Sequence, residues 1–139
     1  STSAYGIGSH RHNAEIQQEL SYIKKSIEFT FTPHILPMFR GILSTIYLNY
    51  KSKANLNKIY NELRRFYMSH KFIKILKNKA LSTNDVINTN NCQISVCKSK
   101  DKKKLIILSS IDNLIKGGAG QAVQNLNLIF NFKLNEGLK

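Results

Sequence analysis

Three consecutive residues, His10, Arg11 and His12, form a cluster of side chains that could do acid–base and anion-binding chemistry. An imidazole changes its protonation state near neutral pH, so it can give a proton to a substrate oxygen in one step and recover it in another. If the triplet is extended, the two histidines share one face and Arg11 lies on the other, whereas at a strand-to-helix junction all three can reach one pocket. Two plainer interpretations are an exposed histidine at a helix start and a His-x-His zinc site, which no other ligand cluster accompanies.

Arg40 and Glu15 are further charged candidates. Arg40 follows a loop that is stiffened by two prolines, and its planar guanidinium suits two-point binding of a carboxylate or phosphate. Glu15 falls in the first turn of an expected helix, where the helix dipole favours a carboxylate. The same position could also let Glu15 orient the ring of His10.

The segment Lys116–Gly120 opens the last expected helix without bulky side chains, because it contains three glycines and an alanine. A helix that begins in this way presents backbone N–H groups and a positive dipole end to an anion or to a nicotinamide amide. The same small residues also suit close packing of the helix against a sheet, and we expect both properties to hold.

Two other patterns are not expected to carry chemistry. Gly6 and Gly8 lack the third glycine and the following βαβ context of a dinucleotide-binding fingerprint. Cys92 and Cys97 lie at an odd spacing on one expected strand, and neither has a nearby histidine or helix start to activate it. We therefore expect reduced thiols that are not nucleophiles.

The hydrophobic pattern predicts an α+β fold with a mixed, mainly antiparallel sheet and helices on one face. Strands are expected over residues 5–9, 27–31, 41–50, 72–76, 93–97 and 105–111, and helices over residues 12–24, 54–69 and 118–130. The Lys-rich residues 98–104 are interpreted as a solvated hairpin loop, and the Asn-rich residues 78–91 as a surface loop.

The 139 residues carry a formal net charge of +13, which attracts polyanions. Because the charge is spread along the chain, a small basic nucleic-acid-binding domain is the alternative and not the preferred class. The nearest support for this alternative is the group Arg64, Arg65, Phe66, Tyr67 and Lys71.

No stretch approaches the roughly 20 apolar residues that span a bilayer, and no signal peptide is recognisable. A cytoplasmic location is expected. The first residue is not Met, which favours a processed or excised piece.

Three ordered segments carry a family resemblance: GSHRHNAEI at residues 8–16, FTPHILPMFRGIL at 31–43 and SIDNLIKGGAGQAVQN at 110–125. Together they resemble the C-terminal part of the N-acetyl-gamma-glutamyl-phosphate reductases of arginine biosynthesis. The resemblance covers nearly the whole chain and is weakest over residues 50–104. The related reductase of lysine biosynthesis, which acts on an aminoadipyl phosphate, is an alternative that no residue excludes.

The resemblance implies a C-terminal domain like that of glyceraldehyde-3-phosphate dehydrogenase. Residues 1–111 would bind substrate and support homo-oligomers, and residues 112–139 would form a return helix that packs on a cofactor domain N-terminal to this segment. In such enzymes a cysteine thiolate attacks the acyl phosphate and NADPH reduces the resulting thioester. Because neither that cysteine nor a dinucleotide loop is found here, the chain alone is expected to be inactive.

By the resemblance, His10 is the general acid/base, and Arg11 and His12 are then candidates for holding anionic groups of the substrate. Glu15 and Arg40 are further candidates for binding the substrate, and Asn113, Gly117 and Gly118 are candidates for binding NADP. No metal, nucleic acid or membrane is expected as a partner.

Overall fold

The computed structural model describes residues 1–49 and 55–139, which form two compact units, Ser1–Phe39 and Arg40–Lys139. Each unit is described by itself. The predicted strand over residues 41–50 and the predicted helix over residues 54–69 each include one residue that lies outside the described ranges.

The N-terminal unit contains one helix and one pair of very short strands. The helix α1 spans His12–Ile23, close to the predicted range, and the strands β1 (Ser3–Ala4) and β2 (His34–Ile35) pair antiparallel. The predicted strand over residues 5–9 is wrong, because Gly6 and Gly8 have positive φ angles and form a turn there. Glycine adopts positive φ angles without strain, so two glycines in five residues allow the chain to turn where the prediction had an extended strand.

The predicted strand over residues 27–31 is also wrong, although its pattern corresponds to a real difference in burial. Ile27, Phe29 and Phe31 are partly buried, while Glu28 and Thr30 are exposed, as in a half-buried strand. The segment has no strand assignment. The alternating pattern therefore correctly identified the partly buried side chains. It does not show whether a second strand lies alongside to form hydrogen bonds, and a strand is defined by those bonds.

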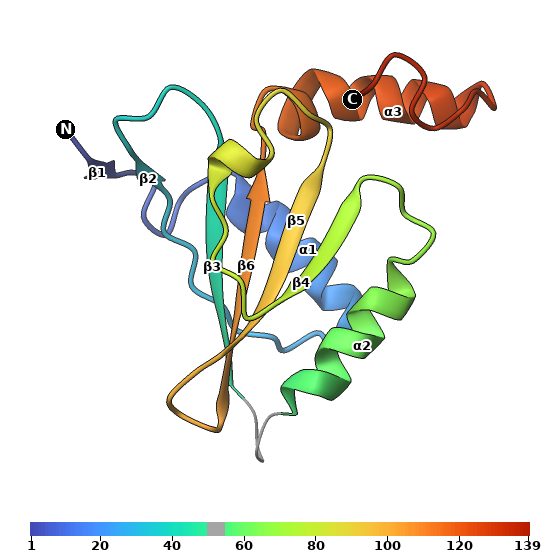
Figure 1. Ribbon diagram of the computed structural model, residues 1–139. Helices are drawn as coiled ribbons and strands as arrows, with labels where there is room; N and C mark the ends of the chain where they lie inside the picture. Colours follow the sequence, from blue (N-terminus) through green and yellow to red (C-terminus); the bar gives the residue numbers. More distant parts are fainter. Residues whose placement is uncertain (50–54) are drawn as a thin grey trace. The chain divides into compact units, whose positions relative to one another are not determined.

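The C-terminal unit contains a four-stranded sheet in the order β3-β6-β5-β4, with the strands side by side in Figure 1. Its elements are β3 (Ile42–Asn49), α2 (Leu56–Phe66), β4 (Ile73–Lys77), the 3₁₀ turn η1 (Thr83–Asp85), β5 (Cys92–Lys98), β6 (Lys104–Ile111), the π-helical turn η2 (Ile115–Ala119) and α3 (Gly120–Ile129). The β3–β6 and β5–β6 pairs are antiparallel and the β4–β5 pair is parallel. The predicted α+β class with a mixed, mainly antiparallel sheet is confirmed.

The strand prediction was accurate where a turn signal and a regular pattern coincide. Strands β5 and β6 are joined by the Lys-rich residues 99–103, and Lys98 pairs with Leu105 across the hairpin. Charged residues between two apolar strands remain in water while the strands pair, so the predicted hairpin loop is confirmed.

Helix α2 packs on β4 and β5 and supplies the core of the unit. Asn55 caps the helix by accepting a hydrogen bond from the Lys58 N–H at 3.0 Å, which satisfies one of the unpaired donors at the helix start. Leu56 of the helix is buried together with Val96 of β5 and Leu105 of β6. Ile59, Leu63 and Ile107 pack around these three side chains.

Residues 78–91 are more ordered than the predicted surface loop. Leu81 and Val86 are buried, and Asn90 is fully buried. The Lys79 N–H donates to Ser95 Oγ of β5 at 3.1 Å. The hydroxyl of Ser110 in β6 donates to the Ser82 carbonyl at 3.2 Å. The segment therefore covers part of the sheet. The prediction followed its largely polar composition and missed the two buried apolar residues, Leu81 and Val86.

The final helix begins later than predicted. Gly118 has non-helical backbone angles (φ −152°, ψ −114°) between η2 and α3. The apolar residues of this segment that are spaced to form one face, Ala119, Ala122, Val123, Leu126 and Ile129, are exposed, and the buried residues of α3 are Gly120 and Asn127. The Asn127 amide donates to the carbonyls of Leu134 and Glu136, which explains why a polar residue is buried here.

Leu105→Ala should destabilise the protein by about 2–5 kcal/mol, because it removes a core side chain that is 1% exposed and leaves a cavity. Urea unfolding followed by circular dichroism measures this change. Met68→Ala, at a residue that is 82% exposed, is the control and should change stability by less than about 0.5 kcal/mol. Equal effects of both substitutions would contradict the assignment of the core.

Candidate functional site

The histidines of the N-terminal unit lie in a cluster of aromatic rings. The His10 ring contacts those of Tyr5, His12 and Phe31, with centroid distances of 5.2, 4.7 and 5.6 Å and edge-on geometry. The backbone reaches His10 through the turn at Gly6, whose carbonyl accepts hydrogen bonds from the N–H groups of Ser9 and His10. The two imidazoles are therefore neighbours at the start of α1.

A backbone hydrogen bond selects one tautomer of neutral His10. The His12 N–H donates to His10 Nδ1 at 3.2 Å. A nitrogen that accepts a hydrogen bond carries no proton, so the proton of the neutral ring is on Nε2. Nε2 is then the ring nitrogen that can donate a hydrogen bond.

Arg11 and Glu15 lie beside these rings in sequence and are exposed. Arg11 is the N-cap residue of α1, and Glu15 lies in the first turn of the helix, where the dipole favours a carboxylate. Both side chains are accessible to a ligand.

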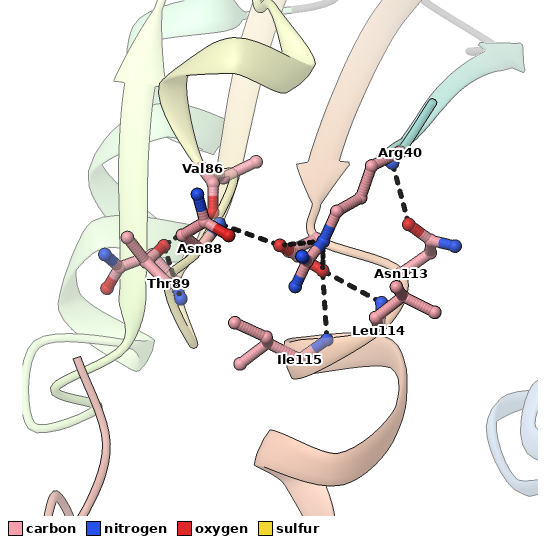
Figure 2. Close-up of polar contacts among 10 residues, drawn as sticks. Arg40, Val86, Asn88, Thr89, Asn113, Leu114 and Ile115 are labelled. Carbon is pink, nitrogen blue, oxygen red and sulfur yellow. Dashed lines mark hydrogen bonds and ion pairs between the residues drawn. The ribbon is translucent and has the colours of Figure 1, made fainter. Parts of the chain in front are cut away.

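The C-terminal unit holds a second constellation around Asp112, whose side chain is fully buried. Arg40 Nε lies 2.9 Å from Oδ1 and 2.8 Å from Oδ2 of this carboxylate. The N–H groups of Leu114 and Ile115 donate to Oδ1 at 2.9 and 3.0 Å, and the N–H of Asn88 donates to Oδ2 at 2.8 Å. Figure 2 shows how these donors come from three separate segments.

The donors determine the ionisation of Asp112. Burial raises the pKa of this carboxyl group, but the hydrogen bonds from Arg40, Asn88, Ile115 and Leu114 favour the charged form more strongly. The net result is a pKa of about 2, below the ordinary value of 3.8. Asp112 is therefore an anion at neutral pH, and its role is to hold its donors in place.

Arg40 is held by Asp112 through Nε, and its side chain is 17% exposed. A guanidinium carries five N–H donors, and the contacts with Asp112 use the one on Nε. The neighbouring residue is tied to the same region, because the Gly41 N–H donates to Asn113 Oδ1 at 2.7 Å (Figure 2). These contacts give the Arg40 side chain a fixed direction.

The predicted cofactor-binding residues lie immediately after Asp112. Gly117 and Gly118 are exposed, so their backbone can be approached closely. The Gly117 N–H already donates to the Asp112 carbonyl at 2.9 Å, and the Asn113 side chain oxygen is used by Gly41. Next to them, Lys116 Nζ donates to Gln124 Oε1 at 2.9 Å, and burial lowers the pKa of this lysine.

The buried cysteine has the character of a structural thiol. Burial raises the pKa of Cys92, although a hydrogen bond with Ser109 and the positive charge of Lys116 act in the opposite direction. A thiol that stays protonated is a poor nucleophile.

Two residues of the site were missed by sequence reasoning. Asp112 was part of a recognised motif but received no role; an acidic residue between an apolar strand and a glycine-rich helix start is a capping signal that could have identified it. Gly6 was considered as part of a predicted strand and of a failed dinucleotide fingerprint, and its contact with His10 has no sequence signal.

Within residues 1–49 and 55–139, no three His, Cys, Asp or Glu side chains gather into a group that could hold a metal ion. Across the same residues, every helix is too short or too polar to cross a membrane.

Comparison with known proteins gives one family and a consistent set of relatives. Residues 1–113 match the family model described as semialdehyde dehydrogenase, dimerisation domain. An N-acetyl-gamma-glutamyl-phosphate reductase of Clostridium botulinum (strain Eklund 17B / Type B) is 48% identical over 136 residues, which cover 96% of this chain and 40% of that protein. The enzyme of the same name from Campylobacter jejuni subsp. doylei is 46% identical, over 98% of this chain and 40% of its own length. The chain thus spans about 40% of the length of these relatives.

Solved structures with a similar fold are aspartate semialdehyde dehydrogenases. The enzyme II of Vibrio cholerae superposes with a TM-score of 0.66 and 16% identity, covering 87% of this chain and 37% of that one. The Francisella tularensis enzyme gives 0.62 and 18%, covering 84% and 34%. The similarity supports the predicted α+β architecture, that of a glyceraldehyde-3-phosphate dehydrogenase-like C-terminal domain.

Asp112→Asn should destabilise the protein by about 1–3 kcal/mol at pH 7, because it leaves charged and backbone donors without their carboxylate. Urea unfolding measures the loss. Asp101→Asn is the matched control, since the Asp101 side chain is 51% exposed and its ion pair with Lys104 is long at 4.0 Å.

The loss should also depend on pH. The pKa of Asp112 is lower in the folded protein than its ordinary value of 3.8, so its stabilising effect is complete above that pH and disappears as the pH falls towards 2. The stability difference between wild type and Asp112→Asn should therefore shrink between pH 5 and pH 2. A constant difference over this range would show that Asp112 does not act through its charge.

Proposed function

The chain belongs to the family of semialdehyde dehydrogenase dimerisation domains, and we propose that it is the C-terminal part of an NADP-dependent N-acetyl-gamma-glutamyl-phosphate reductase. The reaction converts N-acetyl-gamma-glutamyl phosphate to N-acetylglutamate semialdehyde in arginine biosynthesis. The observation that carries the proposal is that relatives of this name are 43–48% identical along nearly the whole chain. The names of these relatives also favour the arginine enzyme over the related reductase of lysine biosynthesis.

In this proposal, the nucleophilic cysteine and the dinucleotide-binding domain belong to the N-terminal part of the longer protein. Bound NADPH supplies the hydride. The residues of this chain hold the substrate and its developing charge, so the chain alone is inactive.

His10 is the general acid/base of the proposed reaction. Reduction of a thioester puts negative charge on the substrate oxygen, and a donor placed beside this oxygen lowers the energy of the transition state. The backbone hydrogen bond to Nδ1 leaves Nε2–H as the donor of the neutral ring. The neighbouring aromatic rings restrict the imidazole to one orientation.

Arg40 is the proposed anchor for an anionic group of the substrate. The acyl phosphate substrate carries a carboxylate and a phosphate, and a guanidinium binds either one through two hydrogen bonds. Arg11, His12 and Glu15 are further proposed contacts, since all three lie at the start of α1 beside His10. The net charge of +13 favours the approach of such a substrate.

Asn113, Gly117 and Gly118 are the proposed contacts with the cofactor. The two glycines are exposed and have no side chains, which fits the close approach of a nicotinamide to the backbone. The Asn113 amide nitrogen is the proposed donor to the cofactor, because the side-chain oxygen already accepts the Gly41 N–H.

Residues 112–139 are proposed to form the helix that packs on the cofactor domain. Leu126, Leu128, Ile129 and Phe130 of this segment are between 47% and 73% exposed. Apolar side chains gathered in this way mark a surface that another part of a protein covers. Residues 1–111 are the proposed substrate-binding and dimerisation part of a cytoplasmic homo-oligomer. The exposed strand β3 offers apolar surface for this association through Ile42, Leu43, Ile46, Tyr47 and Leu48.

His10→Asn in the full-length protein should lower kcat by about 100- to 10,000-fold and leave the fold unchanged, because it removes the general acid/base. The steady-state rate in the semialdehyde-oxidising direction measures the effect. His34→Asn is the matched control, because His34 is an exposed histidine of the same unit. Normal turnover of His10→Asn with loss of turnover in His12→Asn would move the role to His12; activity in both would place the acid/base elsewhere.

Arg40→Lys should raise KM for the substrate by a larger factor than it lowers kcat, because it keeps the charge beside Asp112 but loses the planar, two-point donor. The same steady-state assay separates the two parameters, and a thermal melt reports whether the pairing with Asp112 is retained. Arg64→Lys, at an exposed arginine of α2, should leave both parameters unchanged. An unchanged KM in Arg40→Lys would exclude Arg40 from substrate binding.

A further inference from the structure

We propose that Gly6 is a positioning residue for the imidazole of His10: the absence of a side chain at residue 6 lets the ring occupy its place in the aromatic cluster. The inference rests on the proposed role of His10. It concerns a specific contact between two residues, not the general tolerance of glycine in turns.

The contact is defined by the space around Gly6. A Cβ atom at this residue would lie 3.0 Å from His10 Cβ, 3.1 Å from Cδ2 and 3.3 Å from Cα. Carbon atoms normally approach to about 3.5–4.0 Å, so all three contacts are too close. Cδ2 is bonded to Nε2, which is the proposed donor atom. A side chain at residue 6 would therefore push on the edge of the ring that carries the chemistry.

The surroundings of His10 leave the ring little freedom to move away. Tyr5, His12 and Phe31 lie edge-on around it, and its Nδ1 accepts the His12 N–H. The backbone of His10 is tied to the same glycine, because its N–H donates to the Gly6 carbonyl at 2.9 Å. A displaced ring must give up the Nδ1 hydrogen bond or press on an aromatic neighbour.

Gly8 is a control for Gly6, because it has a similar backbone conformation but no contact with His10. Its φ angle is +69°, close to the +56° of Gly6, so both residues need the left-handed conformation. A Cβ at Gly8 would meet no atom within 4 Å. The two glycines share one turn and one conformational demand, and they differ in the contact with His10.

The experiment compares Gly6→Asn with Gly8→Asn in the full-length reductase. Asparagine tolerates the left-handed conformation better than other side chains, so the backbone cost is similar in both variants. A group displaced by about 1 Å can lower the rate by about 100-fold, and the contacts at Gly6 require a shift of a few tenths of an ångström. Gly6→Asn should therefore lower kcat by about 4- to 10-fold with little change in KM, and Gly8→Asn should resemble the wild type. Equal kcat values for the two variants would overturn the inference.

A double-mutant cycle shows whether Gly6 acts through His10. In a His10→Gly background the ring and its Cβ are absent, so adding Gly6→Asn should not lower the residual rate further, and it should lower the melting temperature no more than adding Gly8→Asn does, since both carry the backbone cost of a left-handed residue. If Gly6→Asn alone does not fold, the double variant should fold as His10→Gly does. An equal loss in both backgrounds, or failure of the double variant to fold, would mean that Gly6 serves the backbone alone.

The same set of variants distinguishes failure of this inference from failure of the proposed function. If His10→Asn keeps full turnover, the role of His10 is wrong. If His10→Asn is inactive and Gly6→Asn is normal, the role of His10 stands and the inference about Gly6 is wrong.

Discussion

The C-terminal unit depends on one interaction, the burial of the Asp112 carboxylate among donors from three segments. A charged group without water is costly unless every oxygen has strong partners. Here Arg40 comes from the residues before β3, Asn88 from the segment between β4 and β5, and Leu114 and Ile115 from the turn after β6. The carboxylate thus links three segments of the chain through hydrogen bonds (Figure 2).

The Asp112 carboxylate supports both the proposed substrate contact, Arg40, and the proposed cofactor contacts, Gly117 and Gly118. The carboxylate that holds Nε of Arg40 also caps the turn leading into Gly117 and Gly118. An arginine fixed through Nε loses little further side-chain entropy when its terminal amino groups bind an anion. The glycines that follow keep their positions because the turn before them is capped. Substrate contact and cofactor contact would therefore be positioned by the same buried charge.

Sequence reasoning succeeded where the information is local. Strands β5 and β6 and their lysine-rich hairpin follow from alternation and a charged loop, and the start of α1 follows from its helical pattern. It failed where a partner lies far away in the chain. Asp112 binds Arg40 across 72 residues and Asn88 across 24, and no pattern around residue 112 encodes these donors. His10 was found from its residue type, whereas the need for glycine at residue 6 comes from a ring that sits against it in space.

The distribution of apolar side chains is consistent with a unit that relies on neighbours. Its compact core is centred on Leu56, Val96 and Leu105, while β3 and α3 expose large apolar residues over much of their length. Exposed apolar surface costs roughly 25 cal/mol per Å² relative to burial, so covering it is a substantial source of stability. In the longer protein that we propose, α3 packs on the cofactor domain and the sheet on a second copy. The same contacts would then stabilise the fold and bring the cofactor towards Gly117, Gly118 and Arg40, which makes assembly a condition for activity.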